Sequence, residues 1–375
     1  MCIVNHLTNN LATLKRDYFM PSYDITGQFT AVQPLSTCSK DLNDKEGGSG
    51  KPIPVPKIKK RDGEYLYFPA TGIRGALRRA ARDVLRQIII DKTGNPTPLS
   101  LDQHYFLTLG GIKGSGDMDR STVADENHWR NANPLLSLFG AGDAGVLGFV
   151  SGHLMVSNAI TQLPCEPIQF SGARTDDIYR DKQQANFLSE SDLENLISRS
   201  MGNKSRSVIQ TQIKALEKDL KKAKGDADKS AEIQSKIEKL KSQITSVKAE
   251  TGAEDVSVGM PLAGWQAIPE GEKLNVRFTI YRANDVELGL FLKTINEFAL
   301  CPILGAHRAN GNGLVSGELT VSKIDTDRKD IGSIRFSELS PAVITGNELT
   351  EALAAFDRWV ESGAIDLSIP KSEKE

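Results

Sequence analysis

Two segments of the chain carry residues whose types and spacing suit the binding of phosphate groups. The first is a row in which arginines recur every four residues: Arg74, Arg78, Arg82 and Arg86. Side chains at this spacing lie along one side of a helix. Gly72 and Gly75 stand near the start of this predicted helix, where exposed backbone N–H groups and a guanidinium can together hold a phosphate. The alternative is a solvated basic face that is paired with acidic neighbours.

The second segment is a glycine-rich loop within residues 303–321. It contains His307, Arg308, Asn310 and Gly311. Small residues and backbone N–H groups in such a loop let a phosphate backbone approach closely. We therefore predict that this loop contacts a polyanion, and an ordinary connecting loop is the alternative.

The other glycine runs do not fit a nucleotide site. Gly140, Gly142 and Gly145 match G-x-G-x-x-G, but the residues after them resemble a strand, whereas a dinucleotide fold needs a helix there. In the run GGSGK at 47–51, Pro52 stands where a phosphate loop has Ser or Thr. Both runs are therefore predicted to be turns.

Strands and helices must position the phosphate-binding candidates. Residues 23–35 alternate apolar and polar side chains, which predicts a strand. The arginine row shares its helix with an apolar face, and this helix is predicted to begin near Thr71, whose hydroxyl can cap the first turn. A further strand at 273–281 and an amphipathic helix at 285–300 lead directly into the glycine-rich loop.

Residues 205–250 predict an antiparallel helical hairpin. Apolar residues recur at intervals of four and three on both sides of Gly225 and Asp226, and the segment has no aromatic residue. From 204 to 250 there are twelve Lys or Arg against seven Asp or Glu, whereas the whole chain has a net charge of -2. The hairpin is either a spacer or assembly contact, or a basic finger near nucleic acid.

Length and composition predict a globular protein. The chain has 375 residues, of which 39% are hydrophobic, enough for the core of one large domain or two ordinary ones. No apolar run approaches the roughly 20 residues that cross a bilayer, and residues 1–19 lack a signal-peptide core, so we expect a cytoplasmic protein without membrane contact. The four cysteines form no C-x-x-C pair, so no metal site, disulfide framework or cofactor is expected.

The order of these motifs resembles the RAMP superfamily of CRISPR-associated proteins. The first strand is followed by PATGIRGALR at Pro69 to Arg78, Leu-Phe-Gly at Leu138 to Gly140, SGHLMVSNA at Ser151 to Ala159, and the late glycine-rich loop. The match is closest to the backbone subunit of class 1 effectors, in the type IV branch. The family's first motif usually reads Ile-Pro-Gly-Ser-Ser-Leu-Lys-Gly-x-Leu-Arg. Gly75, Leu77 and Arg78 agree with it, whereas Phe68, Ala70, Thr71 and Gly72 depart from it.

The resemblance implies an α+β fold, with a ferredoxin-like or RNA-recognition-like βαββαβ core and a long inserted β-hairpin called the thumb. The core would comprise residues 20–162 and 269–325, and the thumb insertion residues 163–268. The helical hairpin at 205–250 would lie within the thumb, and residues 326–375 would form a C-terminal extension.

The resemblance also implies that many copies of the chain bind one single-stranded guide RNA as a filament. Arg174 would contact the kinked RNA, and Met260 would lie beside a displaced base. Target DNA or RNA would pair with the guide, and other effector subunits, including a helicase and a guide-processing nuclease, are the implied partners. Each copy would hold only a few phosphates, which agrees with the modest net charge.

We expect no catalytic residue and no enzymatic activity of the chain's own. One alternative is a RAMP-type endoribonuclease that uses His307 or the loop acids Asp41 and Asp44, although the sequence supplies no evident second catalytic group. The other is a structural assembly protein that packs through the helical hairpin. That alternative leaves the arginine row and the glycine-rich loop without a role.

Overall fold

A computed structural model describes residues 20–37, 52–111, 122–175, 182–222, 227–251, 259–337 and 339–371. The chain divides into two compact units. The first comprises Met1–Phe170 and Trp265–Glu375, and the second comprises Ser171–Gly264. The candidate catalytic acids Asp41 and Asp44 lie outside the described residues.

The first unit is built on one antiparallel sheet with the expected βαββαβ order. Its elements in chain order are β1 (Ser22–Ala31), α3 (Ala70–Thr93), β5 (Leu154–Val156) with β6 (Ala159–Thr161), β9 (Lys273–Ile280), α10 (Asp285–Leu300) and β10 (Val315–Ile324). In the sheet, β1 lies between β10 and β9, and β5 and β6 both pair with β9 on its other side. This is the strand order of a ferredoxin-like fold, so the predicted α+β class is confirmed.

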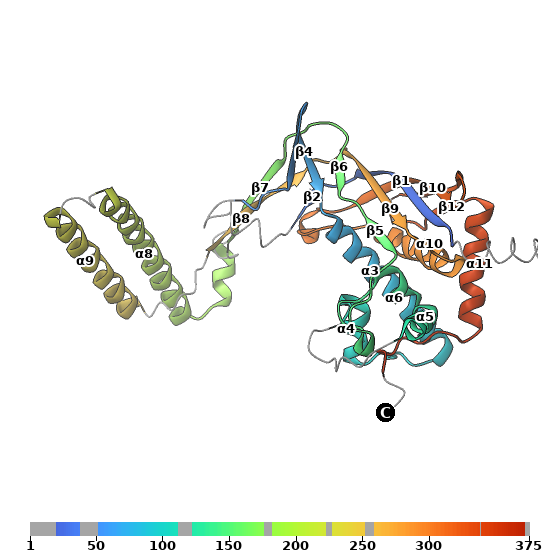
Figure 1. Ribbon diagram of the computed structural model, residues 1–375. Coiled ribbons are helices and arrows are strands. Elements are labelled where there is room, and N and C mark those ends of the chain that lie inside the picture. The colour runs from blue at the N-terminus through green and yellow to red at the C-terminus, as the bar shows by residue number, and fades with distance from the viewer. Residues whose placement is uncertain are drawn as a thin grey trace, which may run out of the picture. The chain divides into compact units, whose positions relative to one another are not determined.

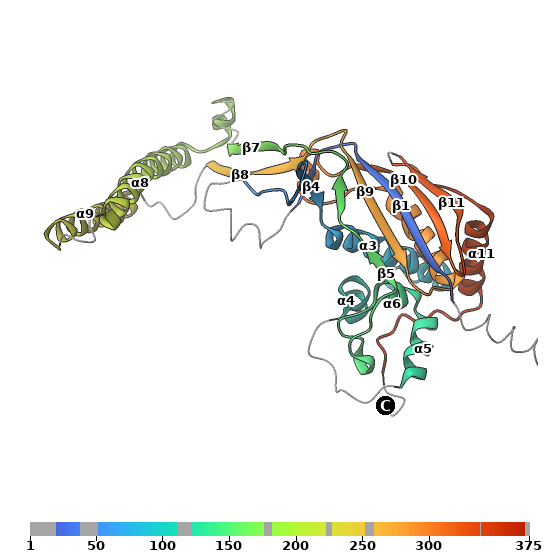
Figure 2. The same ribbon diagram turned by 45° about the horizontal axis from the view of Figure 1, so that its top comes forward.

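The helices α3 and α10 lie on one face of this sheet (Figures 1 and 2). On β1 the side chains of Tyr23, Ile25 and Phe29 are buried toward the helices, whereas Thr26 and Gln28 face the open side. Phe29 packs against Phe278 and Phe336, and Phe278 packs in turn against Phe291 of α10. Burying each such ring stabilises the fold by about 2 kcal/mol. The strand periodicity read from the sequence is therefore confirmed.

Further strands extend the sheet at both edges. On one side β11 (Arg328–Phe336) pairs with β10, and β12 (Val343–Thr345) pairs with β11. On the other side β4 (Gly63–Phe68) pairs with β6, and β3 (Lys57–Lys60) pairs with β4. Helix α11 (Asn347–Glu361) packs on α10 at Gly289, where a Cβ atom would lie 2.3 Å from the carbonyl oxygen of Ala352. Residues 326–375 thus contribute strands and a helix to this unit.

Helix α3 begins at Ala70, and the prediction that Thr71 caps it is wrong. Its N-cap residue is Pro69, which has no side-chain hydrogen bond to offer. Instead, the N–H of Ala70 donates to Oδ1 of Asn158 over 2.8 Å. A side chain next to β6 therefore accepts a hydrogen bond from one of the backbone N–H groups that have no partner within the first turn of the helix. The helix ends before Gly94, whose positive φ of 66° closes it in the left-handed conformation.

Three short helices precede the glycines at 140–145: α4 (Leu101–Leu109), α5 (Val123–Ala132) and α6 (Pro134–Phe139). The last of these glycines, Gly145, begins a single 3₁₀ turn (Gly145–Leu147), and β5 follows, so this run is a turn as predicted. At Gly140, φ is 60° and a Cβ atom would lie 2.4 Å from the carbonyl oxygen of Val150. This glycine therefore permits a tight turn in which the backbone passes close to Val150. Within the described residues, none of the helices combines the length and apolarity that crossing a membrane requires.

The second unit contains the predicted helical hairpin. Helices α8 (Glu190–Lys222) and α9 (Ala227–Thr251) pack against each other (Figure 1). Ile213 of α8 and Ile237 of α9 are buried. The hairpin is confirmed, but α8 begins at Glu190, well before residue 205. Residues 190–204 contain no proline that would interrupt a helix.

Two longer strands, β7 (Ile168–Thr175) and β8 (Gly259–Ile268), flank this insertion in the sequence. They are neighbours in a three-stranded sheet whose third member is β2 (Leu35–Ser36). The strands that flank the helical hairpin in the sequence are thus paired with each other.

Candidate nucleic-acid interface

Arg78 lies in the interior, and the prediction that it faces a phosphate is wrong. Its guanidinium donates to four backbone carbonyl oxygens: Phe106 at 3.0 Å, Leu107 at 2.7 Å, Phe139 at 3.2 Å and Gly140 at 2.8 Å. Burial, with a smaller contribution from nearby Arg74, lowers the pKa of Arg78 to about 10, which still leaves the side chain charged at neutral pH. Arg78 therefore ties α3 to α4 and to the glycine turn at 140.

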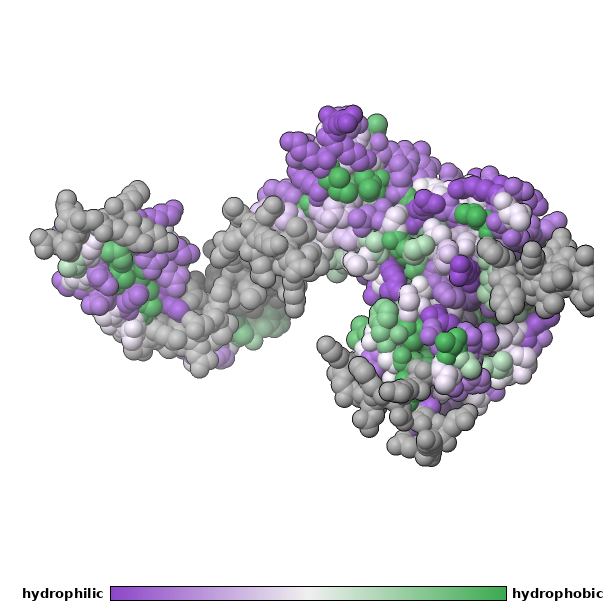
Figure 3. Space-filling view, in the orientation of Figure 1, coloured by the Kyte–Doolittle hydropathy of each residue, from purple (hydrophilic) through white to green (hydrophobic). Residues whose placement is uncertain are grey.

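Arg74 is half-buried and also donates to the carbonyl oxygen of Phe139. Burial lowers its pKa from the ordinary arginine value. Together with Arg78 it lines a small pocket of about 270 Å³ whose wall includes the exposed side chains of Leu109 and Phe149. Hydrophobic residues are visible on this part of the surface, over α4 and α6 (Figure 3).

The two remaining arginines of the row fit the alternative prediction, a basic face that is paired with acidic neighbours. Arg82 pairs with Asp83 at 2.8 Å and also donates to Oγ1 of Thr108 at 2.9 Å. Arg86 pairs with the same Asp83 at 3.0 Å. This part of the row is thus a basic face with an acidic neighbour. Arg79, beside the row, is exposed.

The glycine-rich loop presents Arg308, Asn310 and Gly311 to solvent. Two left-handed residues, His307 at φ 57° and Gly311 at φ 70°, bracket a single 3₁₀ turn over Arg308–Asn310. The loop is fixed at its base, because Ser36 Oγ donates to the carbonyl oxygen of Ala306 at 2.8 Å. Arg308 contacts the Cys301 sulfur at 3.6 Å, a weak contact that leaves most of its N–H groups facing outward.

Phe68 brings the glycine-rich loop and the start of α3 together. A Cβ atom on Gly72 would lie 2.8 Å from one edge of the Phe68 ring, and a Cβ atom on Gly305 would lie 3.0 Å from the other. Both glycines therefore allow their backbones to approach the same ring closely. Gly72 is exposed and Gly75 is half-buried one turn further along α3. Two predicted segments that are far apart in sequence thus lie side by side.

Three rings stack at this loop, one of them His307 of the loop itself, and sequence reasoning did not find the stack. The Phe170 ring stacks on Trp265 with centroids 5.3 Å apart, and Trp265 stacks on His307 at 3.9 Å with an angle of 8°. Trp265 is buried, and the two outer rings are partly exposed. Burial lowers the pKa of His307, which favours the neutral imidazole. The signal in the sequence for this stack is Trp265, which lies near the end of the predicted thumb insertion.

Two residues of the predicted interface have known strands but no described side chains. Arg174 lies in β7 and Met260 lies in β8. Their roles in contacting RNA stay predictions. His153, within the motif at 151–159, pairs through Nδ1 with the buried carboxylate of Glu287 at 2.9 Å, and Ser137 donates to the same oxygen. That motif therefore also ties the sheet edge to α10.

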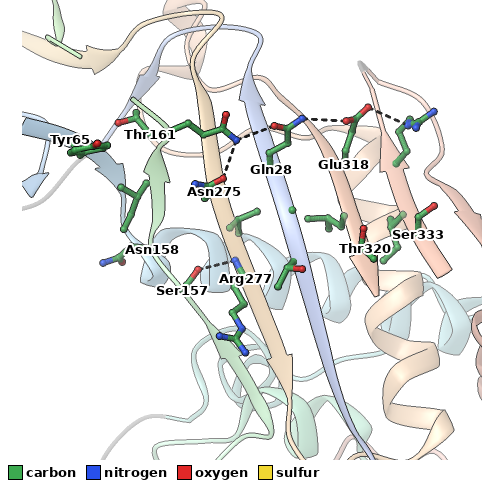
Figure 4. Close-up of a pocket in the computed structure, with 18 of the residues that line it drawn as sticks. Gln28, Tyr65, Ser157, Asn158, Thr161, Asn275, Arg277, Glu318, Thr320 and Ser333 are labelled. Carbon is green, nitrogen blue, oxygen red and sulfur yellow. Dashed lines mark hydrogen bonds and ion pairs between the residues drawn. The ribbon is translucent and has the colours of Figure 1, made fainter. Parts of the chain in front are cut away.

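The open face of the sheet carries a polar groove of about 850 Å³ (Figure 4). Across its floor, Gln162 donates to Asn275 at 3.0 Å and to Gln28 at 3.1 Å, and Gln28 donates to Glu318 at 3.3 Å. Arg335 pairs with Glu318 at 3.4 Å at the far end of this row. The row runs from the end of β6 across β9, β1 and β10 to β11.

Beside this groove, two arginines clamp a buried carboxylate. Asp24 on β1 is fully buried. One of its oxygens accepts from Arg277 at 2.6 Å, and the other forms an ion pair with Arg328 at 2.9 Å. The arginine side chains are 58% and 52% exposed, so they cover the carboxylate and still face solvent. The clamp has two positive charges and one negative charge.

Comparison with known proteins gave structures but no sequence relative. No family model and no curated protein matches the chain. A chain of a type IV-B CRISPR complex is similar with a TM-score of 0.41 and 13% identity, covering 80% of this chain and 90% of that one. A chain of the Csm3-Csm4 subcomplex of the type III-A CRISPR-Cas interference complex is similar with a TM-score of 0.32 and 10% identity, covering 91% and 97%.

Proposed function

We propose that this protein is a subunit of a class 1 CRISPR effector complex in which repeated copies bind one guide RNA as a backbone. The observation that carries this proposal is the meeting of the α3 start and the glycine-rich loop at Phe68, next to the ring stack. An exposed arginine, loop N–H groups and partly exposed rings are what a sequence-independent single-strand site needs.

Each part has a distinct task at this interface. Arg308 and the loop between the left-handed residues His307 and Gly311 hold phosphate oxygens, because a guanidinium and clustered N–H groups both favour anions. The outer faces of the ring stack hold bases by stacking, which is tolerant of sequence. The guide is thereby gripped by its backbone, and most of its bases can pair with target DNA or RNA.

Repetition supplies the affinity that a single copy lacks. The chain's net charge of -2 permits only a few phosphate contacts per copy. Copies aligned on one strand act together, so their combined affinity exceeds that of one copy by orders of magnitude. The protein holds the RNA without cutting it, and partners in the complex carry out guide processing, unwinding or cleavage.

Sequencing of the RNA that copurifies with the protein tests this proposal. We expect short species of uniform length that each join repeat and spacer sequence. Arg308→Glu should lower the amount of bound RNA severalfold and make the dependence on salt shallower, since a phosphate contact contributes about one unit of that slope.

The matched control is Arg358→Glu, which makes the same charge change on an exposed position of α11. Equal RNA loss in both variants, or copurified RNA of random origin, contradicts the proposal. Cleavage of the bound RNA by purified protein with a divalent metal would favour the endoribonuclease alternative instead.

A further inference from the structure

We infer that the open face of the sheet is a second binding site for single-stranded nucleic acid, separate from the interface at Phe68. The groove is lined by residues of β3, β4, β6, β9, β1, β10 and β11 and by residues that flank β6. None of the residues Phe68, Gly72, Trp265, His307 and Arg308 lines it. The two surfaces are therefore built from different side chains.

The floor of the groove offers hydrogen bonds of the kind that base edges use. Gln28, Gln162 and Asn275 form a row of primary amides, and each amide has both donor and acceptor atoms. A base edge also combines donors and acceptors, and amide side chains match it well. The bonds within the row are 3.0–3.3 Å long and exposed to solvent, so a ligand can exchange with them at little cost.

The charges around the groove are complementary to phosphates. Its lining contains three basic side chains, Lys60, Arg277 and Arg335, against a single acid, Glu318. Asp24 offsets only one of the two positive charges of the clamp, because it is shared between Arg277 and Arg328. The clamp instead holds the Arg277 guanidinium in one place at the groove wall.

The mode of binding differs from that of RNA-recognition domains, which stack bases on aromatic residues of the central strands. At the open-face positions of β1 and β9 this chain has Thr26, Gln28, Asn275 and Arg277. The site consequently recognises bases by hydrogen bonds and the backbone by charge. The groove can accept either a DNA or an RNA strand, because the row of amides does not depend on the sugar.

The test measures binding of a fluorescent, non-complementary oligonucleotide of about eight nucleotides, as DNA and as RNA, to the protein purified with whatever RNA it carries. Arg335→Glu should weaken binding about tenfold, and the double variant Gln28→Ala with Asn275→Ala should do the same. Arg358→Glu, with the same charge change on α11, should bind like the unmodified protein. The relative affinities of the DNA and RNA probes identify which strand the groove serves.

Photocrosslinking with a halogenated pyrimidine in the oligonucleotide locates the site independently of any variant. Crosslinks should fall in β1, β9 or β10. Crosslinks confined to the glycine-rich loop, or equal binding by the Arg335→Glu and Arg358→Glu variants, would overturn the inference. These two results do not test the proposed guide-binding function. That function is tested by the amount of copurified RNA, which is measured separately and which the Arg335→Glu variant should retain.

Discussion

Arginines in two regions of the first unit have opposite surroundings. On α3, Arg78 is buried and donates to backbone carbonyls, and Arg74 donates to one of the same oxygens. On the open sheet face, Arg277 and Arg328 share the buried carboxylate of Asp24 while more than half of each side chain stays in solvent. The first pair joins segments of the interior, and the second pair presents positive charge.

The acceptors decide which role an arginine has. Buried carbonyl oxygens at the end of α4 and at the glycine turn can accept further donors, and a planar guanidinium with five N–H groups can reach several of them at once. A carboxylate instead fixes one edge of a guanidinium and leaves the other edge free for a ligand. Regular spacing in the sequence therefore says little about what an arginine binds.

The largest effect is expected for Arg78→Ala. Removing this side chain takes the guanidinium donor away from the buried carbonyl oxygens of Leu107 and Gly140 and opens a cavity, so the free energy of unfolding should fall by about 3 kcal/mol. Urea denaturation followed by circular dichroism measures it. Arg79→Ala, at an exposed neighbouring position, should change the free energy of unfolding by less than about 0.5 kcal/mol. Similar losses in the two variants would show that Arg78 does not brace the interior.

A smaller loss is expected for Asp24→Asn. The amide keeps the shape of the carboxylate but lacks its charge, and the two exposed guanidiniums can turn to water, so the free energy of unfolding should fall by about 1–2 kcal/mol. The same denaturation experiment checks this value. Glu318→Gln is the control, because its pair with Arg335 is exposed and should contribute at most about 0.5 kcal/mol. A larger loss in the control would remove the distinction between the clamp and an ordinary surface pair.

The smallest effect concerns the pH dependence of the ring stack. The folded pKa of His307 lies below the ordinary 6.5, because burial disfavours the charged ring. The stability gained from the neutral ring is complete above pH 6.5 and is lost as the pH falls through the lowered folded pKa. Heteronuclear NMR of the histidine rings should show His307 titrating below pH 6.5, with His307→Asn identifying the signal. Titration above pH 6.5 would contradict the stacked, partly buried position.

Local periodicity predicted much of the fold. The alternation in 23–35, the apolar face of α3 and the spaced apolar residues of the helical hairpin each depend on near neighbours in sequence, and each is found in the structure. The site was harder to predict. The acceptors of Arg78 are about thirty and sixty residues away, at Leu107 and Phe139, and the partner of His307 is Trp265. Contacts of this kind arise from the packing of separate elements, which no spacing rule encodes.

The place of β1 in the sheet has a consequence for the order in which the protein folds. Thr26 of this strand pairs with Arg277 of β9 on one side and with Thr320 of β10 on the other. During synthesis β1 therefore has neither of these two partner strands until some 250 further residues have been added, including the whole helical hairpin. Closing so long a loop costs only about 0.6 kcal/mol more for each doubling of its length, so the insertion slows folding more than it weakens the folded state. Until β9 and β10 emerge, both edges of β1 are open to pairing with another chain, which makes this interval the time of greatest risk of misassembly.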